Sequence, residues 1–68
     1  MFNYAPLWDT MRKKNITQYQ LIKEYQFSTG TLDALRQNRS ITMNTLDTLC
    51  LILDCEPNDI VKIIKDKE

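Results

Sequence analysis

The 68-residue chain contains no histidine, a single glycine and no apolar run of the roughly 18 residues needed to cross a bilayer. Without histidine, the chain lacks the most common general base and metal ligand. One glycine cannot build a glycine-rich phosphate loop, and two cysteines with no second pair do not make a typical zinc site. These absences argue against an enzyme, a metal centre and a membrane span, and neither a cofactor nor a small-molecule ligand is expected.

The beginning of the chain, MFNYAPLWD, lacks the basic segment and the long apolar stretch of a secretory signal. A cytoplasmic location is therefore expected. Cys50 and Cys55 lie in the apolar segment LDTLCLILDCE, where free cysteine behaves as a small hydrophobic residue. In a reducing compartment we expect two free thiols in the core rather than a disulfide.

The net charge is zero, but the charge is unevenly distributed along the chain. Residues 1–46 contain six basic and three acidic side chains, a balance of +3, whereas residues 47–68 contain three basic and six acidic side chains, a balance of −3. A chain with this distribution can present one basic face to a polyanion although it is neutral overall.

Apolar residues recur at helical spacing, and start and stop signals divide the chain into five predicted helices. Pro6 begins the first helix, which ends at RKKN. Thr17 begins the second, with Gln20 in the position of a capping box. Ser28 and Thr42 are the expected caps of the third and fourth helices. The fifth is expected over about residues 57–66, opened by the Glu56-Pro57 pair.

One apolar stripe per predicted helix provides the expected core. Its members are Leu7, Trp8, Met11, Leu21, Ile22, Tyr25, Leu32, Leu35, Leu46, Leu49, Cys50, Leu53, Ile60, Val61, Ile63 and Ile64. Ahead of the helices, Phe2 and Tyr4 alternate with Asn3, which predicts a short extended arm. The sequence thus indicates an all-α fold, organised as one domain over residues 1–68.

The position of the single glycine, Gly30, calls for an explanation. It falls in the first turn of the third predicted helix, where glycine is a poor helix former. Either a partner approaches this helix closely, or glycine is simply tolerated on an exposed turn. The second and third helices, over about residues 17–38, are short and closely joined, as in a helix-turn-helix. In that motif the second helix lies in the DNA major groove.

The segment TQYQLIKEYQFSTGTLDALRQNRSITMNTLDTLCLILDCEPNDI resembles the lambda repressor-like (Cro/cI-type, XRE) helix-turn-helix family, especially its small stand-alone bacterial members. The resemblance rests on Thr17-Gln18 with Leu21, on Phe27-Ser28 before Thr31-Leu32, and on LDTL followed by LDCEPNDI, and it covers about residues 6–64. It implies a five-helix DNA-binding domain that regulates transcription in a bacterium or phage, with double-stranded DNA as partner and repression as the expected action.

Three positions depart from the family pattern. Gln26 and Asn38 stand where the family usually has glycine, and Ile22 stands where it usually has alanine. A side chain at positive φ costs on the order of 1 kcal/mol, so a reshaped turn at Gln26 is expected. Ile22 is expected to require extra room between the second and third helices.

The resemblance also implies the residues that contact DNA. Contacts to the sugar-phosphate backbone are implied at Gln18, Thr31, Asn38, Arg39 and Ser40. The groove-facing side of the third helix is implied to consist of Thr29, Gly30, Asp33 and Ala34. Positions 29–34 contain no arginine, lysine, glutamine or asparagine, the usual bidentate readers of bases. Specificity is therefore expected to be low, indirect, or supplied by Arg36, Arg39 or the N-terminal arm.

Two further hypotheses follow from the same residues. The small groove-facing surface, poor in hydrogen-bond donors, and the zero net charge also suit a protein-interaction module, such as an adaptor or antirepressor, with the same fold but a decayed DNA surface. In addition, the four apolar residues of the fifth predicted helix cover a wide arc of its surface. This arc indicates either a homodimer through the C-terminal helix or a terminal helix that lies skewed on the core.

Overall fold

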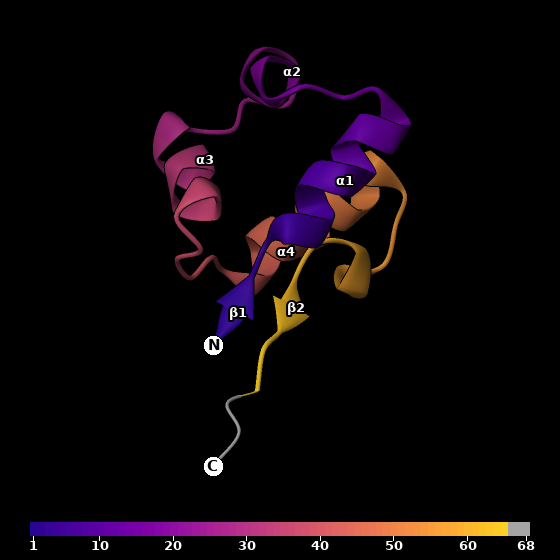
Figure 1. The fold of residues 1–68 in the computed structure, drawn as a ribbon. Helices are drawn as coiled ribbons and strands as arrows, with labels where there is room; N and C mark the ends of the chain where they lie inside the picture. The colour runs from indigo at the N-terminus through magenta and orange to yellow at the C-terminus, as the bar shows by residue number, and fades with distance from the viewer. Residues whose placement is uncertain (66–68) are drawn as a thin grey trace.

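The computed structural model describes residues 1–65 and contains four α-helices, one 3₁₀ turn and a pair of short strands. In chain order these are β1 (Phe2–Asn3), α1 (Ala5–Lys14), α2 (Gln18–Lys23), α3 (Thr29–Arg36), α4 (Met43–Leu53), η1 (Pro57–Asp59) and β2 (Lys62–Ile63). Helices α1 and α4 pack together, α2 and α3 extend to one side of them, and the strands lie at the opposite end from α2 (Figure 1). Within residues 1–65, no helix is long and apolar enough to span a membrane.

The predicted N-caps of α2, α3 and α4 are confirmed by their hydrogen bonds. Thr17 Oγ1 accepts from the Gln20 amide at 3.1 Å, and Gln20 Oε1 accepts from the Thr17 amide at 2.8 Å, which completes the capping box of α2. The Ser28 hydroxyl accepts from the Thr31 amide at 3.0 Å and begins α3. Thr42 begins α4 in the same way. Each cap satisfies a backbone N–H that has no partner within its own helix.

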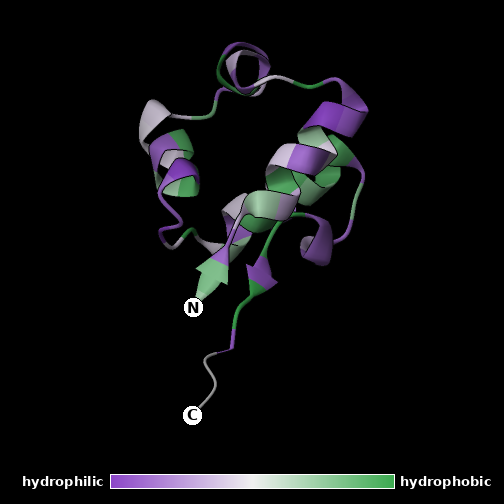
Figure 2. Cartoon of the chain, in the orientation of Figure 1, coloured by the Kyte–Doolittle hydropathy of each residue, from purple (hydrophilic) through white to green (hydrophobic). Residues whose placement is uncertain are grey.

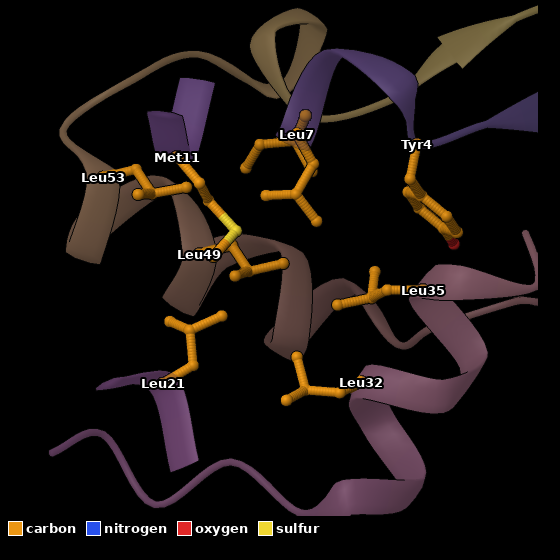
Figure 3. Close-up of a cluster of buried hydrophobic side chains, with 9 residues drawn as sticks. Tyr4, Leu7, Met11, Leu21, Leu32, Leu35, Leu49 and Leu53 are labelled. Carbon is orange, nitrogen blue, oxygen red and sulfur yellow. The ribbon is translucent and has the colours of Figure 1, made fainter. Parts of the chain in front are cut away.

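The core consists of one apolar cluster to which every helix contributes (Figure 3). Its buried members are Tyr4, Leu7, Met11, Leu21, Leu32, Leu35, Leu49, Leu53 and Ile60. All but Tyr4 were predicted from the helical stripes. Figure 2 shows the apolar sides of α1 and α4 where the two helices lie together. The buried side chains therefore hold α3 against the rest of the molecule through its inner face.

Several predicted core residues lie outside this cluster. Trp8, Leu46, Cys50 and Val61 are only half-buried against it. Ile22 and Tyr25 are exposed, so Ile22 needs no room between α2 and α3. Helix α2 is only six residues long and presents Leu21 alone to the core. The other two predicted core residues, Ile63 and Ile64, lie in the C-terminal segment and are exposed.

The prediction of a fifth helix is wrong. Residues 57–59 form a single 3₁₀ turn, closed by a hydrogen bond from the Glu56 amide to Asp59 Oδ2 at 3.1 Å. The chain then extends into β2, and residue 66 of the predicted helix lies outside the described residues. Ile60, Val61, Ile63 and Ile64 are all β-branched, which favours an extended backbone. Residues 57–65 therefore provide no C-terminal helix through which the predicted homodimer could form.

The predicted N-terminal arm is extended and supplies the partner for β2. The two strands are antiparallel, with Phe2 opposite Ile63 and Asn3 opposite Lys62. The amide of Ile64 continues the ladder by donating to the Met1 carbonyl at 2.7 Å. The alternation of Phe2, Asn3 and Tyr4 thus reflects strand pairing, and the resulting two-stranded sheet replaces the fifth helix.

Tyr4 connects this arm to the turn after α3. Its amide donates to Asn38 Oδ1 at 2.9 Å, and its buried hydroxyl donates to the Arg39 carbonyl at 2.7 Å. Asn38 has φ 57°, a left-handed conformation that asparagine tolerates better than most residues. Unlike the glycine usual at this position, asparagine also provides the side-chain acceptor for the arm. We refer to these two hydrogen bonds as the Tyr4 clamp.

The turn between α2 and α3 is not reshaped by Gln26. This residue adopts φ 59°, the conformation that suits a glycine. We expect Gln26→Gly to raise the free energy of unfolding by about 0.5–1 kcal/mol, because the relief of left-handed strain exceeds the extra entropy of glycine in the unfolded chain. Urea denaturation of the two proteins measures this difference.

Asn38→Gly is the matched control, since Asn38 has nearly the same φ but its side chain accepts the hydrogen bond from Tyr4. This variant is expected to gain no stability. A Gln26→Gly protein no more stable than the wild type would show that the turn carries no strain.

Candidate nucleic-acid interface

Helices α2 and α3 form the predicted helix-turn-helix, with Thr17 and Ser28 as their N-caps. Leu32 and Leu35 are fully buried and fix the inner face of α3 (Figure 3). The outer face of α3 consequently carries Thr29 and Gly30, which are exposed, and Asp33 and Ala34, which are partly exposed. The predicted groove-facing residues therefore share one accessible surface.

A groove of about 480 Å³ lies between α3, the turn that follows it and the beginning of α4. Its lining consists of Ser28, Gly30, Thr31, Ala34, Ser40, Ile41, Thr42 and Thr45. Apart from Ile41, these residues are small, and most carry a hydroxyl group that can hydrogen-bond to a phosphate oxygen. The groove contains no charged side chain in its lining and brings together four of the predicted contact residues.

Gly30 is not required by the interior of the protein. Its φ is not positive, and a Cβ at this position would lie 3.8 Å from Ser28 Oγ, an ordinary contact distance. Neither the backbone conformation nor the packing within residues 1–65 therefore explains the glycine. Two explanations for Gly30 remain: a partner that approaches α3 closely, or a glycine that is simply tolerated on an exposed turn.

Asp33 faces two polar side chains beyond the end of α3. Its Oδ2 accepts from Gln37 Nε2 at 2.9 Å and lies 3.5 Å from Arg39 Nη2. Arg39 in turn donates through Nε and Nη2 to Gln37 Oε1. We call these three side chains the Asp33 cluster. They are exposed or half-exposed, so the pairing adds little stability but orients the Arg39 guanidinium beside α3.

Gln37 was not among the predicted site residues. The signal that could have revealed it is its spacing of four from Asp33, which places the two side chains on one side of a helix. From the sequence, Asp33 is expected to be a groove-facing acid and Arg39 a separate contact to the DNA backbone. The structure brings both together through Gln37.

Gln18 and Arg36 are also brought together. Arg36 Nε donates to Gln18 Oε1 at 2.9 Å and connects the end of α3 to the beginning of α2. Gln18 is half-buried and Arg36 is exposed, so the guanidinium lies at the rim of the helix-turn-helix. Asn38, by contrast, uses its side-chain oxygen inside the Tyr4 clamp. The side chain of Asn38 is therefore used to hold the N-terminal arm against the turn after α3.

The two cysteines lie away from this surface, at the end of α4 and beyond it. Both are free thiols and are half-buried rather than fully buried. Burial raises the pKa of each thiol above its usual value, so both are neutral at pH 7. In the part of the chain that the structure describes, no three potential metal-ligating side chains gather into a cluster.

An exposed α3 held against the core by its inner face, and preceded by a capped α2, defines a helix-turn-helix DNA-binding protein. The comparison with known families agrees. Residues 6–66 match the Cro/C1-type helix-turn-helix DNA-binding domain, and the chain belongs to this family. The family consists of DNA-binding regulators and is not typically enzymatic. The resemblance seen in the sequence is thereby confirmed.

Among solved structures, the chain is similar to the transcriptional regulator VanUg, with a TM-score of 0.85. The two sequences are 22% identical, and the alignment covers 96% of this chain and 87% of that one. At this identity the likeness establishes the fold. No curated protein matches the chain at a significant level.

Proposed function

We propose that residues 1–68 act as one domain that represses transcription by placing α3 in the DNA major groove. The groove beside α3 carries this proposal, because its small, hydroxyl-bearing lining leaves space for a sugar-phosphate backbone next to the helix. Repression is the proposed action because blocking a promoter requires only that the DNA site be occupied. The proposed location is the cytoplasm of a bacterium or a phage-infected cell, where such DNA lies.

The proposed phosphate contacts come from the two ends of the helix-turn-helix. Gln18 lies at the beginning of α2, where the helix dipole favours an anion, and Arg36 lies beside it. Thr31 and Ser40 line the groove, and Arg39 directly precedes Ser40 in the chain. Asn38 contributes by shaping the turn through the Tyr4 clamp.

The proposed base-reading surface is small and poor in hydrogen-bond donors. Thr29 and Ala34 provide methyl groups that can contact the methyl group of thymine. The carboxylate of Asp33 is already engaged by Gln37 and Arg39, so its proposed role is to orient them rather than to accept from cytosine. Sequence preference then depends mainly on DNA shape and on close approach at Gly30.

The salt dependence of binding tests this function. Fluorescence anisotropy with a labelled random-sequence duplex should show affinity that falls steeply as salt rises, with a slope set by the number of neutralised phosphates. Selection from randomised duplexes would then identify a preferred operator. Absence of binding at low salt would contradict the proposal.

Arg39→Ala provides a residue-level prediction. Removal of one proposed phosphate contact should weaken binding to all sequences about equally and reduce the salt slope by about one. Lys23→Ala is the matched control, because Lys23 lies at the opposite end of α2 from Gln18 and over the Tyr19 ring. A loss confined to one base position would show instead that Arg39 reads a base.

One observation favours a second candidate function. The outer face of α3 contains Asp33 and no basic residue before Arg36, which would suit a protein partner better than a polyanion. An adaptor or antirepressor of this kind would ignore DNA at every salt concentration. The anisotropy experiment therefore separates the two functions.

A further inference from the structure

The end of α4 brings the two cysteines of the chain together. Asp54, which follows the helix, adopts a left-handed φ of 51°. The amides of Asp54 and Cys55 both donate to the carbonyl of Cys50, the second of them at 3.1 Å. This is the arrangement of a Schellman motif, in which the two residues joined by the longer backbone bond often place their side chains in contact. Cys50 and Cys55 occupy those two positions.

The cysteine side chains meet as this backbone arrangement favours. The two thiols are hydrogen-bonded to each other. Both are half-buried, and both line one hollow of about 370 Å³, together with Met43, Leu46 and Pro57 among others. The sulfur atoms are therefore neighbours that a small molecule in the hollow can reach. The capping of α4 uses backbone bonds alone, so it requires a thiol at neither position.

We propose that Cys50 and Cys55 are a modification site, at which a reversible disulfide forms by exchange with a small-molecule disulfide. One cysteine, as the thiolate, attacks a sulfur of the small disulfide, whose S–S bond breaks and releases one thiolate. The other cysteine then attacks the protein sulfur of this mixed disulfide, forms the internal S–S bond and releases the second thiolate. The two cysteine protons end on the two released thiols. Two protein thiols are thus oxidised, and one small disulfide is reduced.

The geometry of the pair favours the internal disulfide over a lasting mixed one. The second thiol already lies beside the first, so the bond needs little backbone movement. Burial raises the pKa of both thiols, which slows the first attack because only the thiolate reacts. The position of the equilibrium depends instead on how closely the fold holds the two sulfur atoms.

The disulfide has a defined effect on the fold. It would join the end of α4 covalently to the segment that leads into η1, and η1 packs against both α1 and α4. Because the bond restricts the unfolded chain, oxidation should stabilise the folded protein. The pair would thereby make the stability of the protein respond to the redox state of its surroundings.

Glutathione redox buffers test the proposal on the full chain. The protein is equilibrated at mildly alkaline pH over a range of oxidised-to-reduced ratios, quenched with acid, alkylated and weighed by intact mass spectrometry. The wild type should convert to a monomer that is lighter by two hydrogens, with no free thiol and no bound glutathione. In unfolding concentrations of urea, the equilibrium constant for this disulfide should fall at least roughly tenfold.

Three outcomes would overturn the proposal. These are accumulation of protein that carries glutathione, formation of covalent dimers in place of the internal bond, and equal equilibrium constants in the folded and unfolded protein. Cys50→Ser and Cys55→Ser are the matched variants, because each leaves one thiol and should stop at the mixed disulfide. The wild-type measurements decide the matter by themselves if a variant fails to fold.

Urea denaturation provides a second readout. The oxidised wild type should unfold at a higher urea concentration than the reduced protein, and dithiothreitol should restore the lower midpoint. A protein with both Cys50→Ala and Cys55→Ala should have the same midpoint with and without oxidised glutathione. An oxidised wild type that is no more stable than the reduced protein would contradict the proposed effect on the fold.

These measurements use no DNA, so they are independent of the proposed function. A protein that binds DNA with the expected salt dependence but forms no internal disulfide would contradict this inference alone. A protein that forms the disulfide but binds no DNA would contradict the proposed function alone.

Discussion

Replacing Gly30 by leucine or glutamine is expected to lower the affinity for DNA on the order of tenfold or more, equivalent to about 1.4 kcal/mol, without loss of the fold. The added side chain would occupy the groove beside α3, where Gly30 and Ala34 now leave space. The interior tolerates the change, because a Cβ at Gly30 meets only Ser28 Oγ at 3.8 Å. The helix itself should gain up to about 1 kcal/mol, since glycine is a poor helix former.

Anisotropy titrations and urea denaturation of the same proteins measure the two effects separately. Gly30→Ala should lie between the wild type and the larger variants in affinity, and leucine controls for any hydrogen bond that glutamine makes to a base. Higher stability with undiminished affinity in all three variants would show that the glycine is merely tolerated.

The second large effect is expected at Tyr4. Tyr4→Ala removes a buried ring together with the hydroxyl bond of the Tyr4 clamp, and we expect it to lower the free energy of unfolding by about 3–5 kcal/mol. Tyr4→Phe keeps the ring and removes the hydroxyl that donates to the Arg39 carbonyl. Its expected cost is about 1 kcal/mol, with a measurable loss of DNA affinity because the turn carrying Arg39 is less well fixed.

The pH dependence of stability isolates the hydroxyl. Burial raises the pKa of Tyr4 above 10.0, so folding favours the neutral phenol. Its contribution is complete below the pKa of the unfolded chain and is lost as the pH rises through the higher pKa of the folded state. Urea denaturation at pH 8 and near pH 11 should show a larger loss of stability for the wild type than for Tyr4→Phe. Equal losses of stability in the two proteins would mean that the Tyr4 hydroxyl is neither buried nor bonded to the Arg39 carbonyl in the folded protein.

The helix starts were predictable because capping is local: Thr17, Ser28 and Thr42 each bond to an amide three residues ahead. The C-terminal segment was not, because its structure depends on a strand about sixty residues away. Helical spacing and strand alternation both fit Ile60, Val61, Ile63 and Ile64, and only the presence of β1 decides between them.

In the candidate site, too, features set by neighbouring residues were predictable, and contacts between distant residues were not. Periodicity predicted which residues of α3 face outward, because Leu32 and Leu35 determine its inner face. The distant partners of Arg36 and of Asn38, which follows α3, were not predictable from local spacing. Asn38 is occupied by Tyr4, and Arg36 by Gln18, across 34 and 18 positions of the sequence respectively.

The strand pair has a consequence for the order in which the protein matures during synthesis. Strand β1 is made first, but it cannot pair until Lys62 and Ile63 have also been made, after all four helices. Closing so long a loop is slow compared with forming local helices. The arm that carries Tyr4 is therefore expected to dock late, and the turn holding Arg39 becomes fixed only then. A nascent chain would acquire its helices before it acquires a fully ordered surface beside α3.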